Sequence, residues 1–272
     1  MRKKYISLLL LILFVSAPSS AQKALTILQT SDVHSRIEPM SQKGDRDYNK
    51  GGFIRRATFL KEFRKTNPEM LLFDCGDFSQ GTPYYNLFKG EIEINLMNEM
   101  KYDVVTIGNH EFDNGLDNMA RIFKMADFPI VCANYNFDAT VLKGLVKPYV
   151  ILNHYGLKIG VFGIGTQLEG MVQKSKCKGV IYSKPVPVAN KMAALLRAKG
   201  CDLVICLSHI GITEDTAMIP QTHNIDIVFG GHSHTFLRRP KFISDADGKK
   251  IPLIHTGCNG IYVGRLDLTL TH

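Results

Sequence analysis

The sequence lacks the cysteine pairs that build thiolate zinc sites. Six cysteines occur in 272 residues, and no two have the C-x-x-C spacing typical of such sites. Cys201 and Cys206 flank the strand-like DLVI, and an extended strand of this length separates them by more than a disulfide spans. Cys75, Cys132 and Cys206 stand in apolar, strand-like surroundings. Buried free thiols are therefore favoured, and a disulfide framework is the weaker alternative.

Long apolar runs are also scarce. The first residues, MRKKYISLLLLILFVSAPSSA, have a basic start, an apolar run from Ile6 to Val15, and small residues at Ser19 and Ala21. This pattern predicts a secretory signal peptide over residues 1–21 and export to the periplasm or the extracellular space. The run is shorter than the about 20 residues of a membrane span, so an uncleaved anchor is the less favoured alternative. No stable membrane insertion is expected after cleavage.

No linker rich in proline, glycine or serine divides the rest of the chain, and no repeat interrupts it. Its length and its hydrophobic content of 45% suit one α/β domain with a large core. We predict a single domain over residues 23–272. Removal of residues 1–21 takes away Arg2, Lys3 and Lys4 and no acid, which lowers the formal net charge from +8 to +5. This mild balance is compatible with a phosphate-bearing ligand, and nothing indicates a nucleic-acid polymer as a partner.

Apolar, β-rich runs recur along the chain, with amphipathic helical patterns between several of them. Residues 53–63 place Phe53, Ala57, Leu60 and Phe63 on one stripe, and residues 188–196 repeat the pattern. Strands that alternate with helices predict an α/β sheet protein. The predicted strands are residues 24–30, 70–73, 103–107, 128–133, 158–164, 202–207, 226–230, 252–257 and 261–270.

Five of the predicted strands are followed directly by Asp, Asn or His. A single residue of this kind is more often a helix cap or a turn former than a ligand. Five such strand ends in one chain instead favour a ligand site, because open α/β sheets gather their ligands at the carboxyl ends of strands. The candidates are Asp32 and His34, Asp74 and Asp77, Asn109, His110, Glu111 and Asp113, His209, and finally His232 and His234.

This set of donors favours a pair of divalent metal ions. Imidazole nitrogen with carboxylate and amide oxygen, and no thiolate, suits zinc, manganese, iron or cobalt. The ligands are too many for one tetrahedral ion. Two ions about 3.5–4 Å apart clamp the attacking and leaving oxygens in known enzymes that hydrolyse phosphate esters. The sequence therefore predicts two divalent metal ions and phosphoryl chemistry.

The motifs carry a family resemblance. D-x-H, G-D, G-N-H-E, a lone S-H after a strand and G-H-S-H, in this order, resemble the calcineurin-like metallophosphoesterases. The phrases LQTSDVH, GDFSQGTP, GNHEFDNG and GCNGIYVGRL narrow the resemblance to the 5'-nucleotidase group, and it covers residues 25–270. The resemblance implies an α/β fold in which a two-sheet sandwich is flanked by helices, the metallophosphoesterase-like αββα arrangement, in a single domain.

The resemblance also implies individual roles. Asp77 would bridge the two ions, because a carboxylate has two oxygens to share. His110 would face the substrate with Asp113 orienting its ring, and a metal-bridging hydroxide would attack phosphorus. Asn109 and His110 would contact the substrate, and Glu111 would support the site.

The motifs also imply two sets of metal ligands. One ion would be held by Asp32, His34, Asp77 and His234, and the other by Asp77, Asn109, His209 and His232. His154, His223, His255 and His272 fall outside the motifs and are expected to have no direct role.

The function implied is release of phosphate from 5'-nucleotides, in nucleotide catabolism. A 2',3'-cyclic nucleotide phosphodiesterase, a nucleotide-sugar hydrolase and a thiosulfohydrolase-like enzyme are alternatives on the same fold. A metal-bound subunit with little activity outside a complex is an alternative of another class.

Two-domain 5'-nucleotidases carry a C-terminal domain that binds the nucleoside, and this chain stops before it. Either smaller or more varied phosphoesters are the substrates, or a separate C-terminal-domain protein is a partner. The basic segment 35–52 is either a loop that grips substrate or a solvated loop.

Overall fold

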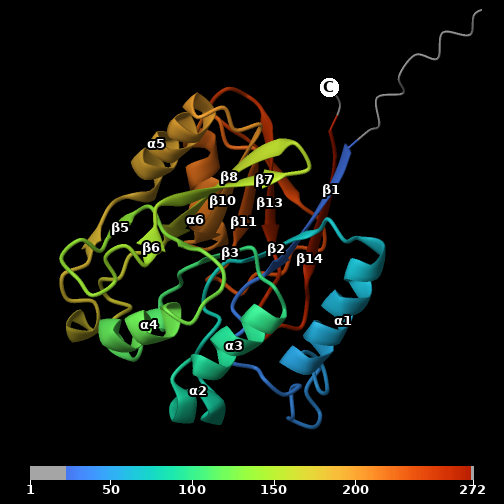
Figure 1. The fold of residues 1–272 in the computed structure, drawn as a ribbon, viewed down its shortest axis with the longest axis vertical. Helices are drawn as coiled ribbons and strands as arrows, with labels where there is room; N and C mark the ends of the chain where they lie inside the picture. Colours follow the sequence, from blue (N-terminus) through green and yellow to red (C-terminus); the bar gives the residue numbers. More distant parts are fainter. Residues whose placement is uncertain (1–22, 271–272) are drawn as a thin grey trace, which may run out of the picture.

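In this computed structural model, residues 23–270 are described, and the predicted signal peptide over residues 1–21 lies outside the described residues. Two six-stranded sheets lie against each other, and helices cover both outer faces (Figure 1). The predicted two-sheet sandwich in a single domain is therefore confirmed. All six cysteines are free in the structure, which agrees with the favoured prediction. Within the described chain, no helix has the length and apolar character needed to cross a membrane.

The first sheet has the strand order β14-β1-β2-β3-β4-β6. Its strands run parallel, apart from β14, which pairs antiparallel with β1. A separate two-stranded ribbon pairs β5 with β9. The bounds are β1 (Lys23–Thr30), β2 (Leu71–Asp74), β3 (Val104–Thr106), β4 (Ile130–Val131), β5 (Tyr135–Asn136), β6 (Val146–Lys147), β9 (Ile181–Tyr182) and β14 (Gly264–Leu270).

The second sheet has the strand order β12-β13-β11-β10-β8-β7. Its four inner strands are parallel, and the two edge strands pair antiparallel with their neighbours. Antiparallel edge strands on a parallel sheet are common in large α/β folds. The bounds are β7 (Tyr149–His154), β8 (Leu157–Gly165), β10 (Leu203–His209), β11 (Ile227–Gly230), β12 (Lys241–Ser244) and β13 (Lys250–His255).

In the described chain, six α-helices pack on the outer faces of the sandwich (Figure 1). Helix α2 shows how local sequence sets a boundary: Thr82 caps it by accepting the N–H of Tyr85, and Pro83 occupies the first turn. Short 3₁₀ turns add residues His110–Phe112, Lys174–Lys176 and Ile219–Gln221. The helices are α1 (Phe53–Thr66), α2 (Pro83–Phe88), α3 (Glu91–Glu99), α4 (Gly115–Phe123), α5 (Pro185–Ala198) and α6 (Ile212–Met218).

Alternate side chains along each strand enter different apolar layers. Ile27 of β1 packs between the two sheets, whereas its neighbour Leu28 packs in the layer that contains Leu60 of α1. A third layer joins the second sheet to α5 through residues such as Leu196. This period of two is the geometry of a β-strand buried on both faces. Both faces of each sheet are covered by other elements. A ligand site is therefore expected at the polar ends of the strands.

Candidate metal centre

The predicted ligands come from loops at the carboxyl ends of both sheets. The loops after β1, β2 and β3 belong to the first sheet, and those after β10 and β11 belong to the second. They meet at one edge of the sandwich and bring together residues from opposite ends of the described chain. Three groups have possible ligand atoms within 4.8 Å of one another: Asp32, His34 and His234; His34, Asp77 and His110; and Asp77, His209 and His232.

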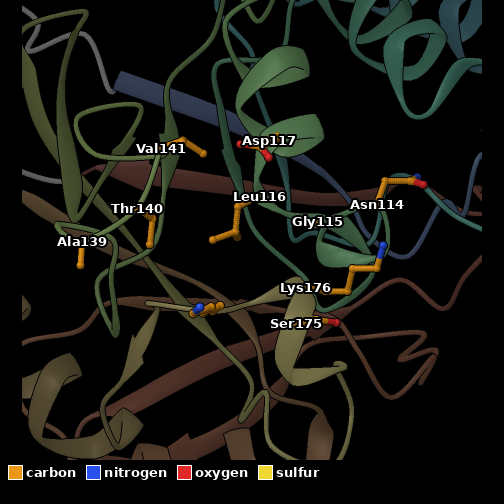
Figure 2. Close-up of a pocket in the computed structure, with 10 residues that line it drawn as sticks. Asn114, Gly115, Leu116, Asp117, Ala139, Thr140, Val141, Ser175 and Lys176 are labelled. Carbon is orange, nitrogen blue, oxygen red and sulfur yellow. The ribbon is translucent and has the colours of Figure 1, made fainter.

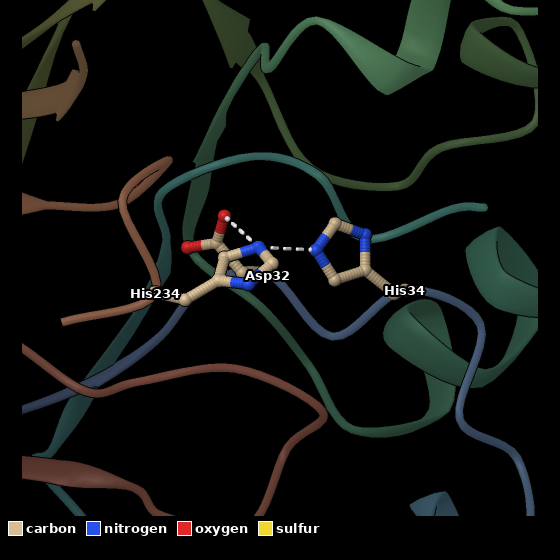
Figure 3. Close-up of side chains that lie close together, drawn as sticks. All are labelled: Asp32, His34 and His234. Carbon is tan, nitrogen blue, oxygen red and sulfur yellow. Dashed lines mark hydrogen bonds and ion pairs between the residues drawn. The ribbon is translucent and has the colours of Figure 1, made fainter. Parts of the chain in front are cut away.

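His234 stands between His34 and Asp32 (Figure 3). Its Nε2 lies 2.8 Å from Nε2 of His34 and 3.5 Å from Oδ1 of Asp32. The Asp32 carboxylate is fully buried and accepts the backbone N–H of His232 at 3.0 Å, as well as the hydroxyl of Ser31. Two imidazole nitrogens and a carboxylate oxygen thus converge from two loops, which is a donor set that suits a divalent cation.

His209 and Asp77 form the centre of the second group. Nε2 of His209 lies 3.1 Å from Oδ2 of Asp77, and both side chains are buried. Nδ1 of His209 donates to the carbonyl oxygen of Cys75 at 2.5 Å. This bond holds one ring proton on Nδ1, so Nε2 is the ring nitrogen that would be available to a metal ion. The ring of His232 is 5.2 Å away, centroid to centroid.

Two buried atoms in this group test whether a metal fits. Within the described residues, Asn109 Oδ1 is buried without a hydrogen-bond partner, and His209 Nε2 is buried with the Asp77 carboxylate 3.1 Å away. A buried polar atom left without a partner costs about 1–3 kcal/mol and calls for an explanation. Both atoms are electron-pair donors of the type that transition metals bind. The residues therefore fit a bound divalent cation.

The pKa values show how strongly these groups perturb one another. Burial raises the pKa of Asp32 to about 7, with Asp77 adding to the rise and His209 opposing it. Burial also opposes ionisation of Asp77, but the charge of His209 and its hydrogen bond bring the pKa of Asp77 below its ordinary value. Burial lowers the pKa of His34 to about 4. Two carboxylates and a neutral imidazole packed this closely, away from water, create a place that attracts positive charge.

The backbone is strained at most of the predicted ligands. A left-handed φ is uncommon for residues other than glycine and costs about 1–3 kcal/mol when the surrounding structure imposes it. Such strain is concentrated at functional sites in proteins generally. Five of the seven predicted ligands have it: Asp32 (φ 52°), His34 (φ 50°), Asp77 (φ 54°), His232 (φ 75°) and His234 (φ 54°).

Glu111 supports the loop that carries Asp77. Its carboxylate is buried and accepts the N–H groups of Asp77 at 2.9 Å and of Gly108 at 2.7 Å. Gly108 is required there, because a Cβ at that position would lie 2.1 Å from Oδ1 of Asp77. Ser79 adds a longer contact through its N–H at 3.3 Å. Glu111 thus has the supporting position predicted from the sequence.

His110 and Asp113 lie beside both metal-binding groups. Nδ1 of His110 is 2.9 Å from Oδ2 of Asp113, and the His110 N–H donates to Oδ1 of Asp77 at 2.8 Å. Burial opposes protonation of His110, but the hydrogen bond to Asp113 and the charges of the neighbouring carboxylates together outweigh it and raise the pKa of His110. The His110 ring lies 5.5 Å from that of His34, centroid to centroid. The pair is partly exposed and therefore accessible to a substrate.

An open cavity of about 630 Å³ begins at Asn114, the residue after Asp113. Figure 2 shows Asn114 and Lys176 at one end of this cavity, with Ala139 and Val141 farther along it. Lys178 also lines it. Its lining includes Asn114 but neither His110 nor Asp113.

Sequence reasoning missed one buried polar group behind the centre. Asp215 of α6 accepts the hydroxyl of Ser208 at 2.5 Å and pairs with Nε2 of His255 at 2.8 Å. All three side chains are buried, and Ser208 immediately precedes His209. His255, which falls outside the sequence motifs, therefore pairs with a buried acid in this structure. In the sequence, this group is indicated by Asp215, an acidic residue in the segment that forms α6, where it lies on the buried side.

The other histidines outside the motifs also lie away from the centre. His154 Nε2 bonds the carbonyl of Glu69 at 2.6 Å, and His223 pairs with Asp247 at the surface. His272 lies outside the described residues.

Comparisons with known proteins identify the family of this chain. The sequence profile of the calcineurin-like phosphoesterase family matches residues 25–236. The chain is 34% identical over 264 residues to a snake venom 5'-nucleotidase of Crotalus adamanteus, covering 90% of this chain and 45% of the relative. It is 31% identical to the 5'-nucleotidase of Homo sapiens, covering 96% of this chain and 49% of the relative.

Solved structures give the same result. A 5'-nucleotidase precursor from Thermus thermophilus superposes with a TM-score of 0.86 at 29% identity, over 92% of this chain and 52% of that one. The calcineurin-like phosphoesterase YfkN from Bacillus subtilis has a TM-score of 0.77 at 29% identity, over 92% of this chain and 86% of that one.

The protein belongs to the calcineurin-like phosphoesterase family. Within it, the chain resembles the N-terminal catalytic part of the 5'-nucleotidases, and it spans about half the length of the curated relatives it matches. The predicted resemblance is confirmed, and the predicted class, a metal-dependent phosphoester hydrolase, agrees with these comparisons.

Proposed function

We propose that this protein is an exported phosphohydrolase that uses two divalent metal ions to release phosphate from 5'-nucleotides. The observation that carries the proposal is the convergence of Asp32, His34 and His234 with Asp77, His209 and His232 at one edge of the sandwich. The His110–Asp113 pair lies beside both groups. The names of the relatives support the 5'-nucleotide as the substrate class.

The ligand sets follow from the two groups. Asp77 is common to both ions, because it lies with His209 and His232 on one side and with His34 on the other. Zinc, manganese, iron and cobalt all suit these donors. When bound, two such cations supply electrophilic activation of the phosphoryl group and of the water that attacks it. Asp32, His34, Asp77 and His234 would hold one ion, and Asp77, Asn109, His209 and His232 the other.

His110 acts on the substrate in this scheme. With Nδ1 held by Asp113 at 2.9 Å, its Nε2 is left to donate a hydrogen bond to a phosphoryl oxygen or a proton to the departing ribose oxygen. The raised pKa of His110 favours the protonated form that such donation needs. Asn109, on the same turn, contacts the phosphoryl group. The balanced reaction adds water across the P–O bond and yields a nucleoside and phosphate.

The nucleoside part of the substrate needs contacts beyond those that the metal centre makes with the phosphoryl group. The cavity that begins at Asn114 is one place for it, and the lysines that line the cavity suit a further phosphate. A separate protein with a nucleotidase C-terminal domain is the other source of nucleoside contacts. In that case the chain alone has little activity and gains it in the complex.

The decisive experiment is a substrate panel with purified, metal-loaded protein. Faster hydrolysis of 5'-nucleotides than of 3'-nucleotides, 2',3'-cyclic nucleotides, nucleotide sugars and thiosulfonates, with each reaction followed by its own product, would support the proposal. Preference for one of the other classes would replace it. The panel is repeated with an isolated nucleotidase C-terminal domain added, and a large gain in rate would identify a two-protein enzyme.

Export is tested separately. Full-length protein expressed in bacteria should be found outside the cytoplasm and begin at Gln22, as read by N-terminal sequencing. Full-length protein retained in the cytoplasm would contradict the export proposal and leave the catalytic proposal untouched.

A further inference from the structure

A second cavity, of about 470 Å³, borders the N-terminal end of α1. Its walls come from residues 49–52, from the first two turns of α1 and from residues 260–263. Among its lining residues are three cations, Lys50, Arg55 and Arg56, and no acid. The cavity therefore has an excess of positive charge that the metal centre does not use.

Arg56 is the unusual member of this lining. It is 4% exposed, and within residues 23–270 its buried Nε and Nη1 atoms have no hydrogen-bond partner. Its guanidinium carbon lies 4.1 Å above the ring of Phe53, which fixes the position of the group. The nearby buried carboxylate of Asp74 feels its charge but bonds Thr30 and the N–H of Gly76 instead. A buried guanidinium is usually paired, so this one lacks its expected anion.

The other two cations already have partners on the outer side. Nζ of Lys50 lies 3.1 Å from Asp47, and Nη2 of Arg55 donates to Oδ1 of Asn49 at 2.9 Å. These contacts hold both side chains at the rim of the cavity, where their charge adds to that of Arg56. Arg56 is thus the inner donor of the site.

The start of α1 adds a second feature that favours an anion. Gly52 is the N-cap and offers no side-chain hydrogen bond, and the first turn contains no acid. The N–H groups of a first helical turn have no acceptor within the helix and carry a partial positive charge. A helix start of this kind, next to an unpaired buried arginine, has the chemistry of an oxyanion site.

We propose that this cavity binds a phosphate-type oxyanion at a site distinct from the metal centre. The planar guanidinium of Arg56 donates two parallel N–H groups to two oxygens of the anion, and Lys50 and Arg55 neutralise the remaining charge. The lining also contains Phe59 and Tyr262, which leave an apolar wall for the organic part of a phosphate monoester. The inference does not depend on the proposed nucleotidase activity.

The site is close to the centre without being part of it. A Cβ on Gly260 would lie 2.9 Å from Nη1 of Arg56, so the loop and the guanidinium are in contact. The preceding residue, Asn259, donates its N–H to the carbonyl oxygen of Asp32 at 2.7 Å. One loop therefore has the proposed anion site on one side and a predicted metal ligand on the other.

Equilibrium dialysis of radiolabelled inorganic phosphate against the metal-loaded full chain tests the site. We expect two classes of bound phosphate in the wild type, one at the metal centre and one at Arg56. Arg56→Met keeps the length and the apolar contact with Phe53, and should lose one class while retaining the other. Lys65→Met, on the exposed side of the same helix, is the matched control and should retain both.

Phosphate binding that is the same in Arg56→Met as in the wild type, whether as one class or as two, would overturn the proposal. Should Arg56→Met fail to fold, the double variant Lys50→Met with Arg55→Met changes only the rim. It should weaken the second class by about tenfold, the scale expected for the loss of charged hydrogen bonds. Unchanged affinity in a folded double variant, together with a misfolded Arg56→Met, would also count against the site.

A second arm identifies the source of the phosphate. The competitor is a nucleoside 5'-phosphonate, which cannot be hydrolysed. If the natural ligand is an organic monoester, this compound should displace labelled phosphate from the Arg56 class more effectively than unlabelled phosphate does. Displacement no better than by phosphate itself assigns the site to the free anion. Failure of both to displace the label from that class would contradict a specific site.

Discussion

His110 and Asp113 are joined by a 2.9 Å contact between Nδ1 and Oδ2, one turn apart on the same loop. The backbone N–H of His110 simultaneously donates to Oδ1 of Asp77, so the pair is fixed to the predicted bridging ligand. The imidazole therefore has its position set by two independent bonds. In this arrangement Asp113 orients the proposed proton donor, His110, whereas Asp77 is the predicted metal ligand.

Loss of the imidazole should reduce turnover without removing metal. We expect His110→Ala to lower kcat by about 10²–10⁴-fold, the usual contribution of general acid–base catalysis, and Asp113→Asn to have a smaller effect because the ring remains. Turnover and metal content are measured on the same samples. His223→Ala is the matched control, because His223 makes a 2.9 Å contact with Asp247 at the surface. Near-wild-type turnover of His110→Ala on several phosphoesters would exclude the catalytic role.

Removal of one carboxylate charge at Asp77 should release metal. Asp77→Asn preserves the shape of the side chain but removes the anionic oxygen that lies near His209 and His34. We expect fewer bound ions per chain and a loss of turnover of several orders of magnitude, with the circular dichroism spectrum retained. Asp138→Asn changes an exposed carboxylate and should bind metal like the wild type. Full metal content in Asp77→Asn, measured by atomic emission, would contradict the bridging role.

Glu111 should contribute to stability even without metal. Glu111→Gln keeps one acceptor oxygen for the N–H groups of Asp77 and Gly108, which both donate to Oε2, but places an NH₂ group where Oε1 accepts the N–H and the hydroxyl of Ser79. We expect the free energy of unfolding to fall by about 1–3 kcal/mol, the cost of leaving a buried polar group unsatisfied. Urea denaturation of metal-free protein measures it, with the exposed Glu62→Gln as the control. An unchanged denaturation midpoint would remove Glu111 from the supporting structure.

Glu93 of α3 should make stability depend on pH. Its side chain is fully buried, both carboxylate oxygens lack a partner within the described residues, and burial raises its pKa although Ser35 partly opposes the shift. A folded-state pKa above the unfolded value means that the folded state binds more protons between the two values, so stability falls as pH rises through that window. Glu93→Gln cannot ionise and should lack this component.

The measurement is the difference in unfolding free energy between Glu93→Gln and the wild type. At about pH 4 the two proteins should be similar, and at about pH 8 the variant should be the more stable, since the wild type then contains an ionised buried carboxyl. The contributions of titratable groups that both proteins share cancel in this difference. A difference that stays constant over the whole range would show that Glu93 is not buried as a neutral acid.

Much of this fold was readable from local sequence. The predicted strands overlap β1, β2, β3, β4, β8, β10, β11, β13 and β14, because buried parallel strands are continuous apolar runs. The edge strands β7 and β12 were missed because their side chains are only partly buried and their pattern is mixed. Helix α2, with six residues, is too short to show a period. The order of strands in the two sheets depends on contacts between distant segments, which periodicity does not encode.

The candidate site could be predicted from short motifs at strand ends. The structure brings six of the seven predicted ligands together in groups, and the oxygen of the seventh, Asn109, is buried without a partner among the described residues. The buried Asp215–His255 pair and the unpaired guanidinium of Arg56 were not predicted. An acid or a base on an amphipathic helix resembles an exposed residue until the neighbouring layer is known.

At five predicted ligands the left-handed backbone is unfavourable for folding, although the side chains there are the ones proposed for function. Glycine adopts such a φ without strain, yet it has no donor atom for a metal. At His232, whose φ is 75°, a glycine would relax the loop and abolish ligation together. Selection for a sturdier fold alone would therefore drive these positions toward glycine, and the presence of Asp and His there marks residues kept for chemistry at the expense of conformational ease.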